Sequence, residues 1–187
     1  DKHYSIRDRE SVENGDFYGG EPIWVTAERQ GVKTASYFWV GTEAAVAGVH
    51  LSISKRYDQK VPFDDRIDSV MTWFSLPMSH RPRLIMLYFH EPDWTGHEYG
   101  PSSAETVDQI QRMDGIMGTI MDKAGKLSIA DKLNVLIVSD HGMTEVHPKQ
   151  IIDLSAYTDL SRVKTTGAGP TVFLSAESTK TLTTVYN

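Results

Sequence analysis

The chain has 187 residues, of which 40% are hydrophobic and 24% charged, and its net charge is −6. These values are typical of a soluble globular protein of about one domain with a sizeable core. The acidic balance argues against a DNA-binding or RNA-binding surface, because such surfaces need a basic patch. The chain lacks cysteine, so it has no disulfide framework and no thiolate metal site. No apolar run approaches the length of a transmembrane segment.

The N-terminal half alternates helical and strand-like patterns. A helix is predicted over residues 23–30, because Pro22 suits a first turn and Gly31 suits a C-terminal stop. Residues 34–40 are aromatic and β-branched, which predicts a strand. Residues 41–60 have no clear period and are expected to form a surface excursion. Residues 62–76 have one apolar face at helical spacing, which predicts a helix.

Two short apolar runs are the strongest strand signals in the rest of the chain. Residues 84–89 and 133–138 are each interpreted as a strand buried on both faces of a parallel sheet. Between them, Ser102 and Glu105 form a capping-box pattern that opens a long helix. Its methionine-rich apolar stripe is expected to face the core rather than form a binding groove. One or two further strands are expected over residues 163–174.

The order of these elements is strand, helix, strand, helix, strand. This order predicts the α/β class: a doubly wound, mostly parallel sheet with helices on both faces. Ligands of such sheets bind at the carboxyl ends of the strands. The polar residues that follow the two buried runs are therefore the first candidates for a functional site.

Each buried run is followed by an Asp/His pair. Asp93 and His97 stand four residues apart across a glycine, and Asp140 and His141 are adjacent. Carboxylate and imidazole ligands without thiolate suit zinc in a hydrolytic site, with manganese as a second choice. Two such ions would clamp the attacking and leaving oxygens of an in-line phosphoryl displacement. A single Asp-x-x-x-His pattern is more often a surface or helix pair than a metal site, so the prediction rests on the two pairs together.

Several motifs in this sequence resemble those of the nucleotide pyrophosphatase/phosphodiesterase family of the alkaline phosphatase superfamily. The segment EPDWTGHEYGP is similar to the family's E-P-D-x-x-G-H-x-x-G-P, and SDHGM is identical to its S-D-H-G-M. The segments PIWVTA and YFWVGT and the residue Tyr57 followed by VPF also resemble family motifs, in the family's order. These motifs occupy residues 91–101, 139–143, 22–27, 37–42 and 57–63.

The resemblance implies a role for each of six residues. Asp93 and His97 would bind one zinc ion, and Asp140 and His141 the other. Trp39 would line the substrate pocket and Tyr57 would stack on the nucleobase, an interaction that tolerates different bases. The departures from the family pattern are small, with Val40 in place of proline and Thr42 in place of serine.

The resemblance also implies that essential parts lie outside this sequence. Family members carry a nucleophilic Thr or Ser and a further metal-binding Asp on a segment before the equivalent of Asp1, and a third His after the equivalent of Asn187. Residues 1–187 are therefore expected to form part of one alkaline phosphatase-like catalytic domain, incomplete at both ends, in which residues 41–60 contribute to the substrate pocket. The remainder of that domain is an expected partner, and these residues alone are expected to be inactive.

The function expected from the resemblance is zinc-dependent hydrolysis of phosphodiester or pyrophosphate bonds in nucleotides, outside the cytoplasm. The nucleophile is expected to form a covalent intermediate. Two alternatives stay open. One is a phosphodiesterase that acts on lipid or phosphocholine substrates, and the other is a non-catalytic metal-binding or structural module.

Overall fold

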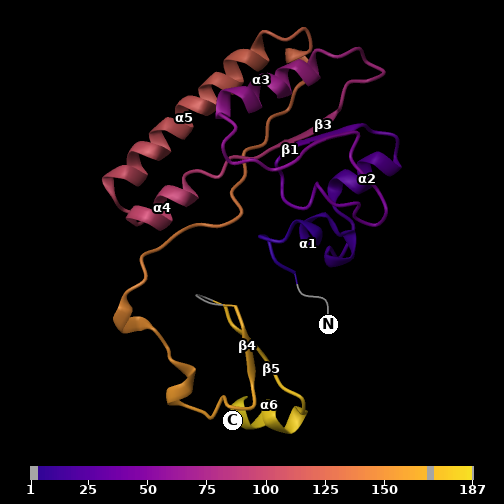
Figure 1. Ribbon diagram of the computed structural model, residues 1–187. Helices are drawn as coiled ribbons and strands as arrows, with labels where there is room; N and C mark the ends of the chain where they lie inside the picture. The colour runs from indigo at the N-terminus through magenta and orange to yellow at the C-terminus, as the bar shows by residue number, and fades with distance from the viewer. Residues whose placement is uncertain (1–3, 168–170, 187) are drawn as a thin grey trace. The chain divides into compact units, whose positions relative to one another are not determined.

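The computed structural model describes residues 4–167 and 171–186, which divide into two compact units, Asp1–Thr144 and Glu145–Asn187 (Figure 1). The regular elements of the first unit are α1 (Arg9–Glu13), η1 (Gly15–Phe17), α2 (Ile23–Arg29), β1 (Thr34–Tyr37), β2 (Ile53–Lys55), α3 (Phe63–Phe74), β3 (Leu84–Leu87), α4 (Asp93–Tyr99), α5 (Ala104–Gly125) and η2 (Ala130–Lys132). In the described residues, no helix is both long enough and apolar enough to cross a membrane.

A three-stranded parallel sheet organises the first unit. The strand order is β2-β1-β3, and both pairings of β1 are parallel. The register aligns Tyr37, the last residue of β1, with Lys55 and with Leu87, which end the neighbouring strands. The carboxyl ends of all three strands therefore meet at one edge of the sheet. The α/β class and the parallel sheet predicted from the sequence are confirmed.

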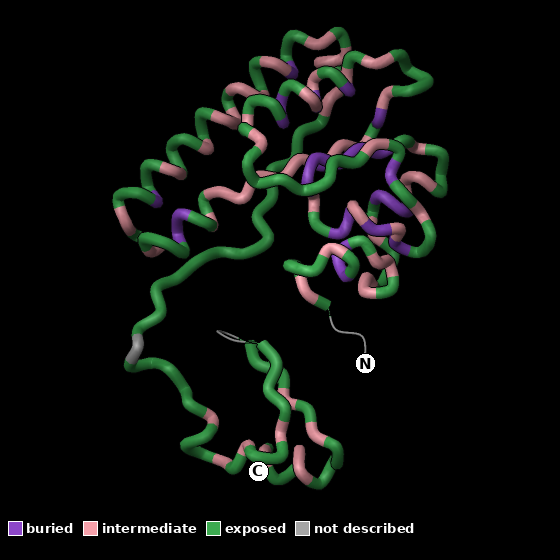
Figure 2. Tube along the Cα trace, viewed as in Figure 1, coloured by how far each residue is buried: buried purple, intermediate pink, exposed green. Residues whose placement is uncertain are grey.

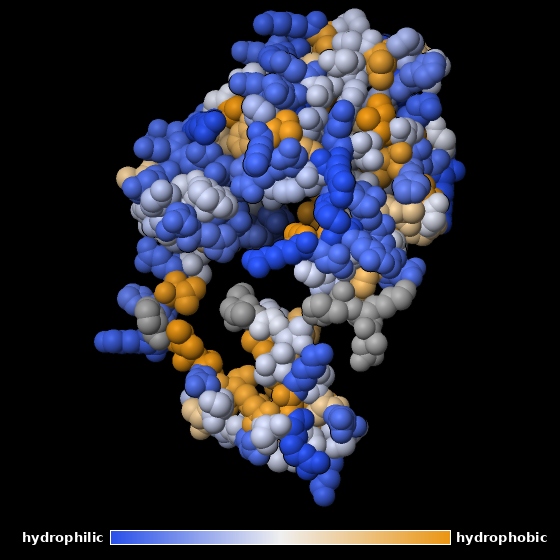
Figure 3. All heavy atoms as spheres, viewed as in Figure 1, coloured by the Kyte–Doolittle hydropathy of each residue, from blue (hydrophilic) through white to orange (hydrophobic). Residues whose placement is uncertain are grey.

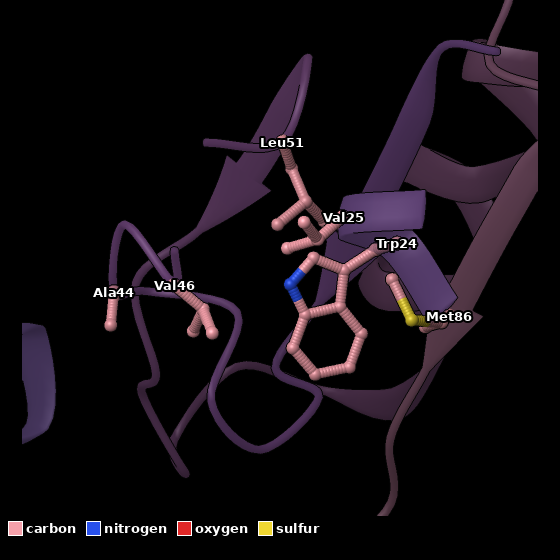
Figure 4. Packing of buried hydrophobic residues seen from close by; sticks show 6 residues of the cluster. All are labelled: Trp24, Val25, Ala44, Val46, Leu51 and Met86. Atoms are coloured by element: carbon pink, nitrogen blue, oxygen red, sulfur yellow. The ribbon is translucent and has the colours of Figure 1, made fainter. Parts of the chain in front are cut away.

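One face of the sheet packs against α2. Trp24 and Val25 from this helix meet Met86 of β3 and three residues from the segment before β2, Ala44, Val46 and Leu51. Figure 4 shows the indole of Trp24 at the centre of this cluster, with Met86 on one side and Val46 on the other. The helix ends as the sequence predicts, because Gly31 adopts a positive φ of 74°, which glycine tolerates without strain.

The opposite face of the sheet packs against α3. Val70 and Trp73 of this helix bury Ala35 and Tyr37 of β1, while Ile85 and Leu87 of β3 pack against the same cluster. Met86 points to the other cluster, as expected from the alternation of side chains along a strand. Helices therefore cover both faces of the sheet, as the doubly wound pattern predicts.

The expectation that residues 41–60 form a surface excursion is wrong for much of that stretch. The strand β2 lies within it, at the edge of the sheet, and Ala44, Val46 and Leu51 are buried in the α2 cluster. A three-residue strand is too short to produce a recognisable period in the sequence. Its pairing with β1 is a long-range contact that local patterns do not report.

The strand predicted over residues 133–138 is absent. The structure gives this run no regular secondary structure, and Leu136 is 83% exposed (Figure 2, green). Residues 84–87 do form a strand, β3, which packs against helices on both faces, although only Met86 is fully buried and, within the described residues, β3 has a neighbouring strand on one side only. The apolar pattern indicates a tendency to be buried, but a strand also needs a partner for its backbone groups.

The long helix α5 confirms the helical prediction but not its details. Its N-cap is Ser103, whose hydroxyl accepts a hydrogen bond from the backbone N–H of Thr106 at 3.1 Å, so the predicted cap at Ser102 is one residue early. The apolar stripe does not reach the core, because all seven of its residues are exposed or half-buried. They are Val107, Ile110, Met113, Ile116, Met117, Ile120 and Met121.

The second unit contains η3 (Pro148–Gln150), η4 (Leu154–Ala156), β4 (Lys164–Thr166), β5 (Phe173–Ser175) and α6 (Thr179–Tyr186). β4 and β5 form an antiparallel pair, which confirms the strands expected over residues 163–174; the glycines 167 and 169 between them lie at or outside the edge of the described residues. Apolar side chains such as Ile151, Ile152 and Phe173 are exposed on this unit (Figure 3).

Glu28, near the end of α2, ties this helix to two strands. One of its carboxylate oxygens, Oε1, accepts hydrogen bonds from the N–H and hydroxyl of Thr34, at 2.8 and 2.7 Å, and from the N–H of Ser52 at 2.9 Å. Burial by itself raises the pKa of Glu28, but these hydrogen bonds outweigh burial and hold the pKa below its ordinary value. The ionised carboxylate therefore stabilises the start of β1 and the approach to β2.

Replacing Glu28 with Gln is expected to lower the free energy of unfolding at neutral pH by about 1–3 kcal/mol, the scale of hydrogen bonds to a charged group. Because the pKa is lowered in the folded state, the contribution of Glu28 is present above the ordinary glutamate pKa and is lost as the pH falls through the lowered value. Urea denaturation at neutral and acidic pH tests this. The parent chain should lose more stability on acidification than the variant does, whereas Glu98→Gln, at an exposed glutamate, should behave like the parent.

Candidate metal and substrate site

The aromatic residues of the candidate site follow the carboxyl ends of the strands. Trp39 lies two residues beyond β1, Tyr57 two residues beyond β2, and Tyr88 directly after β3. Because the register aligns the last residues of the three strands, these side chains start from the same edge of the sheet. This is the edge at which ligands of parallel α/β sheets bind.

Tyr57 has an aromatic neighbour on each side. Its ring centroid lies 5.2 Å from that of Phe38, edge to face, and 6.3 Å from that of Tyr88. Burial raises the pKa of the Tyr57 phenol, although the residue is still 39% exposed. The exposed part of the ring is available to a ligand, as stacking on a base requires.

Trp39 is held by the turn that follows β1. Its backbone N–H donates to the hydroxyl of Ser36 at 3.1 Å, and its carbonyl accepts from the hydroxyl of Thr42 at 2.6 Å. The Trp39 side chain is half-buried and packs against the α2 cluster. Thr42 stands where the related family has serine. Its hydroxyl makes the hydrogen bonds of this turn, so the turn accommodates threonine in place of serine.

The helix α4 carries both Asp93 and His97. Glu91, which precedes the N-cap residue Pro92, binds the first turn of this helix, because its Oε2 accepts from the N–H of Thr95 at 3.1 Å and from the Thr95 hydroxyl at 2.8 Å. Asp93 and His97 lie one turn apart on the helix, with Asp93 Oδ1 3.4 Å from His97 Nε2. Their spacing of four residues therefore brings them together, as the sequence predicts.

The second pair lies beside the first. His141 Nε2 is 3.8 Å from Asp93 Oδ1 and 3.7 Å from Asp140 Oδ2. The two Asp/His pairs, which follow separate apolar runs in the sequence, thus lie as close together as a two-metal site requires. The prediction that both pairs leave buried strands is wrong for Asp140 and His141, because no strand precedes them.

A close approach between Gly96 and Met143 brings the two segments together. A Cβ atom built on Gly96 would lie 2.6 Å from the sulfur of Met143. Only glycine in α4 lets the methionine side chain approach this closely. Residues 139–143 are thereby held against α4, which places His141 beside Asp93. Both residues belong to the sequence motifs, but their contact is a long-range feature that the motifs do not reveal.

The central carboxylate of this cluster has an unsatisfied oxygen. Asp93 Oδ1 is buried and accepts no hydrogen bond from the described residues, although both Nε2 atoms face it. The backbone carbonyl of Gly142, 3.0 Å from His141 Nδ1, raises the pKa of His141, and the Asp140 and Asp93 carboxylates add to this effect. A buried carboxylate oxygen without a partner is suited to a cation.

The residue types of this cluster therefore fit a metal ion, but their arrangement does not yet form a complete binding site. Carboxylate oxygen and imidazole nitrogen are the ligands that zinc takes in catalytic sites without cysteine. However, no group of three or more His, Asp or Glu side chains within residues 4–167 and 171–186 is arranged to hold an ion. The role of Asp93, His97, Asp140 and His141 as metal ligands stays a prediction.

Residues that the sequence did not single out lie close to the site. Phe38 adopts a positive φ of 71°, unusual for a large side chain, and packs against Tyr57. Arg66 is fully buried although it is charged. Its one signal in the sequence is its position, since it stands three residues after Phe63 and four before Val70, within the apolar stripe of α3.

A hollow of about 240 Å³ lies next to the candidate site and includes neither Tyr57 nor Asp93. Its lining includes Phe63, His90, Glu91 and Arg112. Burial lowers the pKa of His90, and the positive charge of Arg66 acts in the same direction. His90 is therefore neutral at neutral pH, and its Nδ1 is buried without a hydrogen-bond partner among the described residues.

The fold and the site together define a class of protein: an α/β domain with aromatic side chains and Asp/His pairs at the carboxyl edge of a parallel sheet. The sequence profile of the type I phosphodiesterase/nucleotide pyrophosphatase family matches residues 1–187. The chain belongs to this family, which lies within the alkaline phosphatase superfamily.

Curated relatives include ectonucleotide pyrophosphatase/phosphodiesterase family member 1 of Homo sapiens and a venom phosphodiesterase of Crotalus durissus collilineatus. The human protein is 41% identical over 162 residues, which are 86% of this chain and 17% of the relative. The venom enzyme is 38% identical over 149 residues, which are 80% of this chain and 18% of the relative. The chain thus spans less than a fifth of these relatives.

Solved structures with a similar fold include murine ectonucleotide pyrophosphatase/phosphodiesterase 5. An inactive variant of that protein in complex with AMP gives a TM-score of 0.81 at 26% identity, covering 95% of this chain and 47% of that chain. The human form of the same protein gives a TM-score of 0.76 at 28% identity, covering 88% of this chain and 43% of that chain. These matches agree with the alkaline phosphatase-like fold predicted from the sequence.

The packing of Met143 on Gly96 predicts a measurable coupling. In a Met143→Ala background, Gly96→Ala should stabilise the chain by about 0.5–1 kcal/mol, because alanine suits a helix better than glycine. With Met143 present, the new Cβ displaces the methionine sulfur and this gain should shrink or reverse. A double-mutant cycle by urea denaturation should give a coupling of at least about 0.5 kcal/mol. Additive effects would show that the contact does not hold residues 139–143 in place.

Proposed function

We propose that this chain supplies part of the active site of a zinc-dependent phosphodiesterase that cleaves phosphodiester or pyrophosphate bonds of nucleotides outside the cytoplasm. The family membership supports the reaction class, and the names of the relatives, an ectonucleotide enzyme and a venom enzyme, support the location. The observation in this chain that carries the proposal is the approach of His97 and His141 to Oδ1 of Asp93, a buried carboxylate oxygen that accepts no hydrogen bond from the described residues.

Each residue has a proposed part in the reaction. Asp93 and His97 hold one zinc ion, and Asp140 and His141 hold the other. Bound zinc supplies positive charge that polarises the phosphoryl group and stabilises the attacking and leaving oxygens. The carboxylates and imidazoles of this chain orient that charge, and His141 must be neutral to bind metal. The attacking hydroxyl belongs to a Thr or Ser outside these 187 residues.

Substrate recognition is proposed to lie with the aromatic residues. Tyr57 stacks on the base through the exposed part of its ring, and Trp39 borders the pocket from the turn after β1. The complex of AMP with the murine relative supports a nucleotide as the ligand of this fold. The two tests below distinguish this proposal from the two alternatives, a lipid or phosphocholine phosphodiesterase and a module without catalysis.

The first test concerns the metal. The full-length protein should contain about two zinc ions per chain, and Asp93→Asn should remove at least one of them. The same substitution should lower the rate of nucleotide-ester hydrolysis by at least about 100-fold, the scale of losing one electrostatic partner of the transition state. Elemental analysis by mass spectrometry and a rate assay measure both effects. Asp114→Asn, at an exposed position on α5, is the control.

The second test concerns the base. Tyr57→Ala in the full-length protein should weaken the reaction of a nucleotide ester by about 1–3 kcal/mol through lost stacking. The p-nitrophenyl ester of thymidine monophosphate and methyl p-nitrophenyl phosphate share a leaving group and differ in the nucleoside. The methyl ester should be affected much less. Equal losses on the two esters would contradict a base-stacking role and would favour a substrate without a base.

A further inference from the structure

Arg66 is a charged residue that the structure buries completely. Its side chain lies on the inner face of α3, with 0% of the residue exposed. The hydrogen bonds that its guanidinium donates end on backbone carbonyl groups, and none of these partners is a carboxylate. Burial lowers the pKa of Arg66, although the Asp58 carboxylate attracts its charge. Burying a charge without a carboxylate bonded directly to it is costly, and an aliphatic side chain at this stripe position would avoid the cost. A purely structural requirement for packing therefore does not explain an arginine here.

The hydrogen bonds of Arg66 connect two segments that lead to different parts of the proposed active site. Nε and Nη2 donate to the carbonyl of Val61, at 3.1 and 3.0 Å, and Nη2 also donates to the carbonyl of Gln59 at 3.3 Å. These carbonyls belong to the segment that directly follows Tyr57. Nη1 donates to the carbonyl of Tyr88 at 3.0 Å, in the segment that leads from β3 to Asp93. One planar group thus fixes the segment of the aromatic pocket relative to the segment of the metal pair.

The faces of the same guanidinium are covered by two aromatic rings. Its central carbon, Cζ, lies 4.9 Å from the ring centroid of Phe38 and 4.8 Å from that of Phe63. Both distances are within the range of cation–π contacts, which are stronger when they are desolvated. Phe38 is the residue whose φ of 71° is unfavourable for a bulky side chain, so its conformation must be held by its surroundings. Arg66 is one of the groups that hold it.

Phe38 in turn contacts Tyr57, so the ring that Arg66 holds also restricts the position of the Tyr57 ring. The Phe38 and Tyr57 rings are 5.2 Å apart at an interplanar angle of 69°. The guanidinium therefore reaches Tyr57 in two ways, through the stacked ring of Phe38 and through the backbone of residues 59–61. Tyr57 itself follows the short edge strand β2, which on its own fixes the direction of the ring only weakly.

We propose that Arg66 is a positioning residue for nucleotide specificity, which holds Tyr57 at the angle and distance from Asp93 that a base-bearing phosphodiester requires. The inference rests on the proposed function and extends it from the residue that stacks on the base to the buried group that orients it. Lysine retains the charge of arginine but lacks the planar fork and stacks less well, so Arg66→Lys separates orientation from charge.

The experiment compares the two p-nitrophenyl esters on the full-length protein and its Arg66→Lys variant. We expect kcat/KM for the thymidine ester to fall by roughly ten-fold more than kcat/KM for the methyl ester, and mainly through KM, because base stacking is lost while the phosphoryl chemistry is kept. An equal loss on both esters, or no loss on either, would overturn the inference. A role in the fold alone would change both esters together.

A matched control is available in Arg112. Its Cζ also lies over the ring of Phe63, at 5.9 Å, but the residue is exposed on α5. Arg112→Lys should leave the ratio between the two esters unchanged. A change as large as that of Arg66→Lys would show that any cation over Phe63 has the effect, which would also overturn the inference.

A second variant decides the case if Arg66→Lys does not fold. Phe38→Leu keeps the carbonyl hydrogen bonds of Arg66 and removes the ring between the guanidinium and Tyr57. A selective loss on the thymidine ester supports the inference, and any other result overturns it. The Tyr57→Ala variant separates the two levels. If it is selective and neither Arg66→Lys nor Phe38→Leu is, the inference alone fails; if Tyr57→Ala is not selective, the proposed base site fails and the inference falls with it.

Discussion

The backbone register of the parallel sheet determines where Trp39, Tyr57 and Asp93 lie relative to one another. Because Tyr37 is aligned with Lys55 and with Leu87, the chain leaves all three strands at the same level. The turn with Trp39, the segment with Tyr57 and the approach to Asp93 therefore begin side by side. Helices on the two faces then hold this edge in place, through Trp24 on one face and through Trp73 on the other. The proposed substrate specificity and the proposed metal chemistry would thus depend on the same few backbone hydrogen bonds.

Much of the fold could be predicted because its signals are local. Pro22 and Gly31 bound α2, the aromatic and β-branched run gives β1, and the apolar face gives α3. The errors arise where a structure depends on distant partners. The pattern of residues 133–138 records apolar character but not whether another strand lies alongside, and β2 is too short to be seen without β1. The prediction that the apolar stripe of α5 faces the core is wrong for the same reason, because the pattern of apolar residues does not show which element packs against them.

The candidate site shows the same division. The pairs Asp93–His97 and Asp140–His141 are visible in the sequence because each is close along the chain, and the family motifs add the aromatic residues. What the sequence does not contain is the contact between the pairs, which depends on the space that Gly96 leaves for Met143. Arg66 was missed because a charged residue in an apolar stripe is normally read as an interruption. Its burial is explained only by carbonyl groups and rings from three separate segments.

The exposed run of residues 133–139 has a consequence for how the chain behaves in concentrated solution. Its sequence, LNVLIVS, has no charge, no proline and no glycine, and Leu136, Ile137 and Val138 are exposed. Short uncharged segments of this kind, rich in β-branched residues, are the usual starting points of cross-β assembly when their backbone groups lack partners. The segment that leads to Asp140 and His141 is thus also disposed to pair with an identical segment of another molecule. Solubility and the completeness of the proposed metal site are therefore linked through one stretch of backbone.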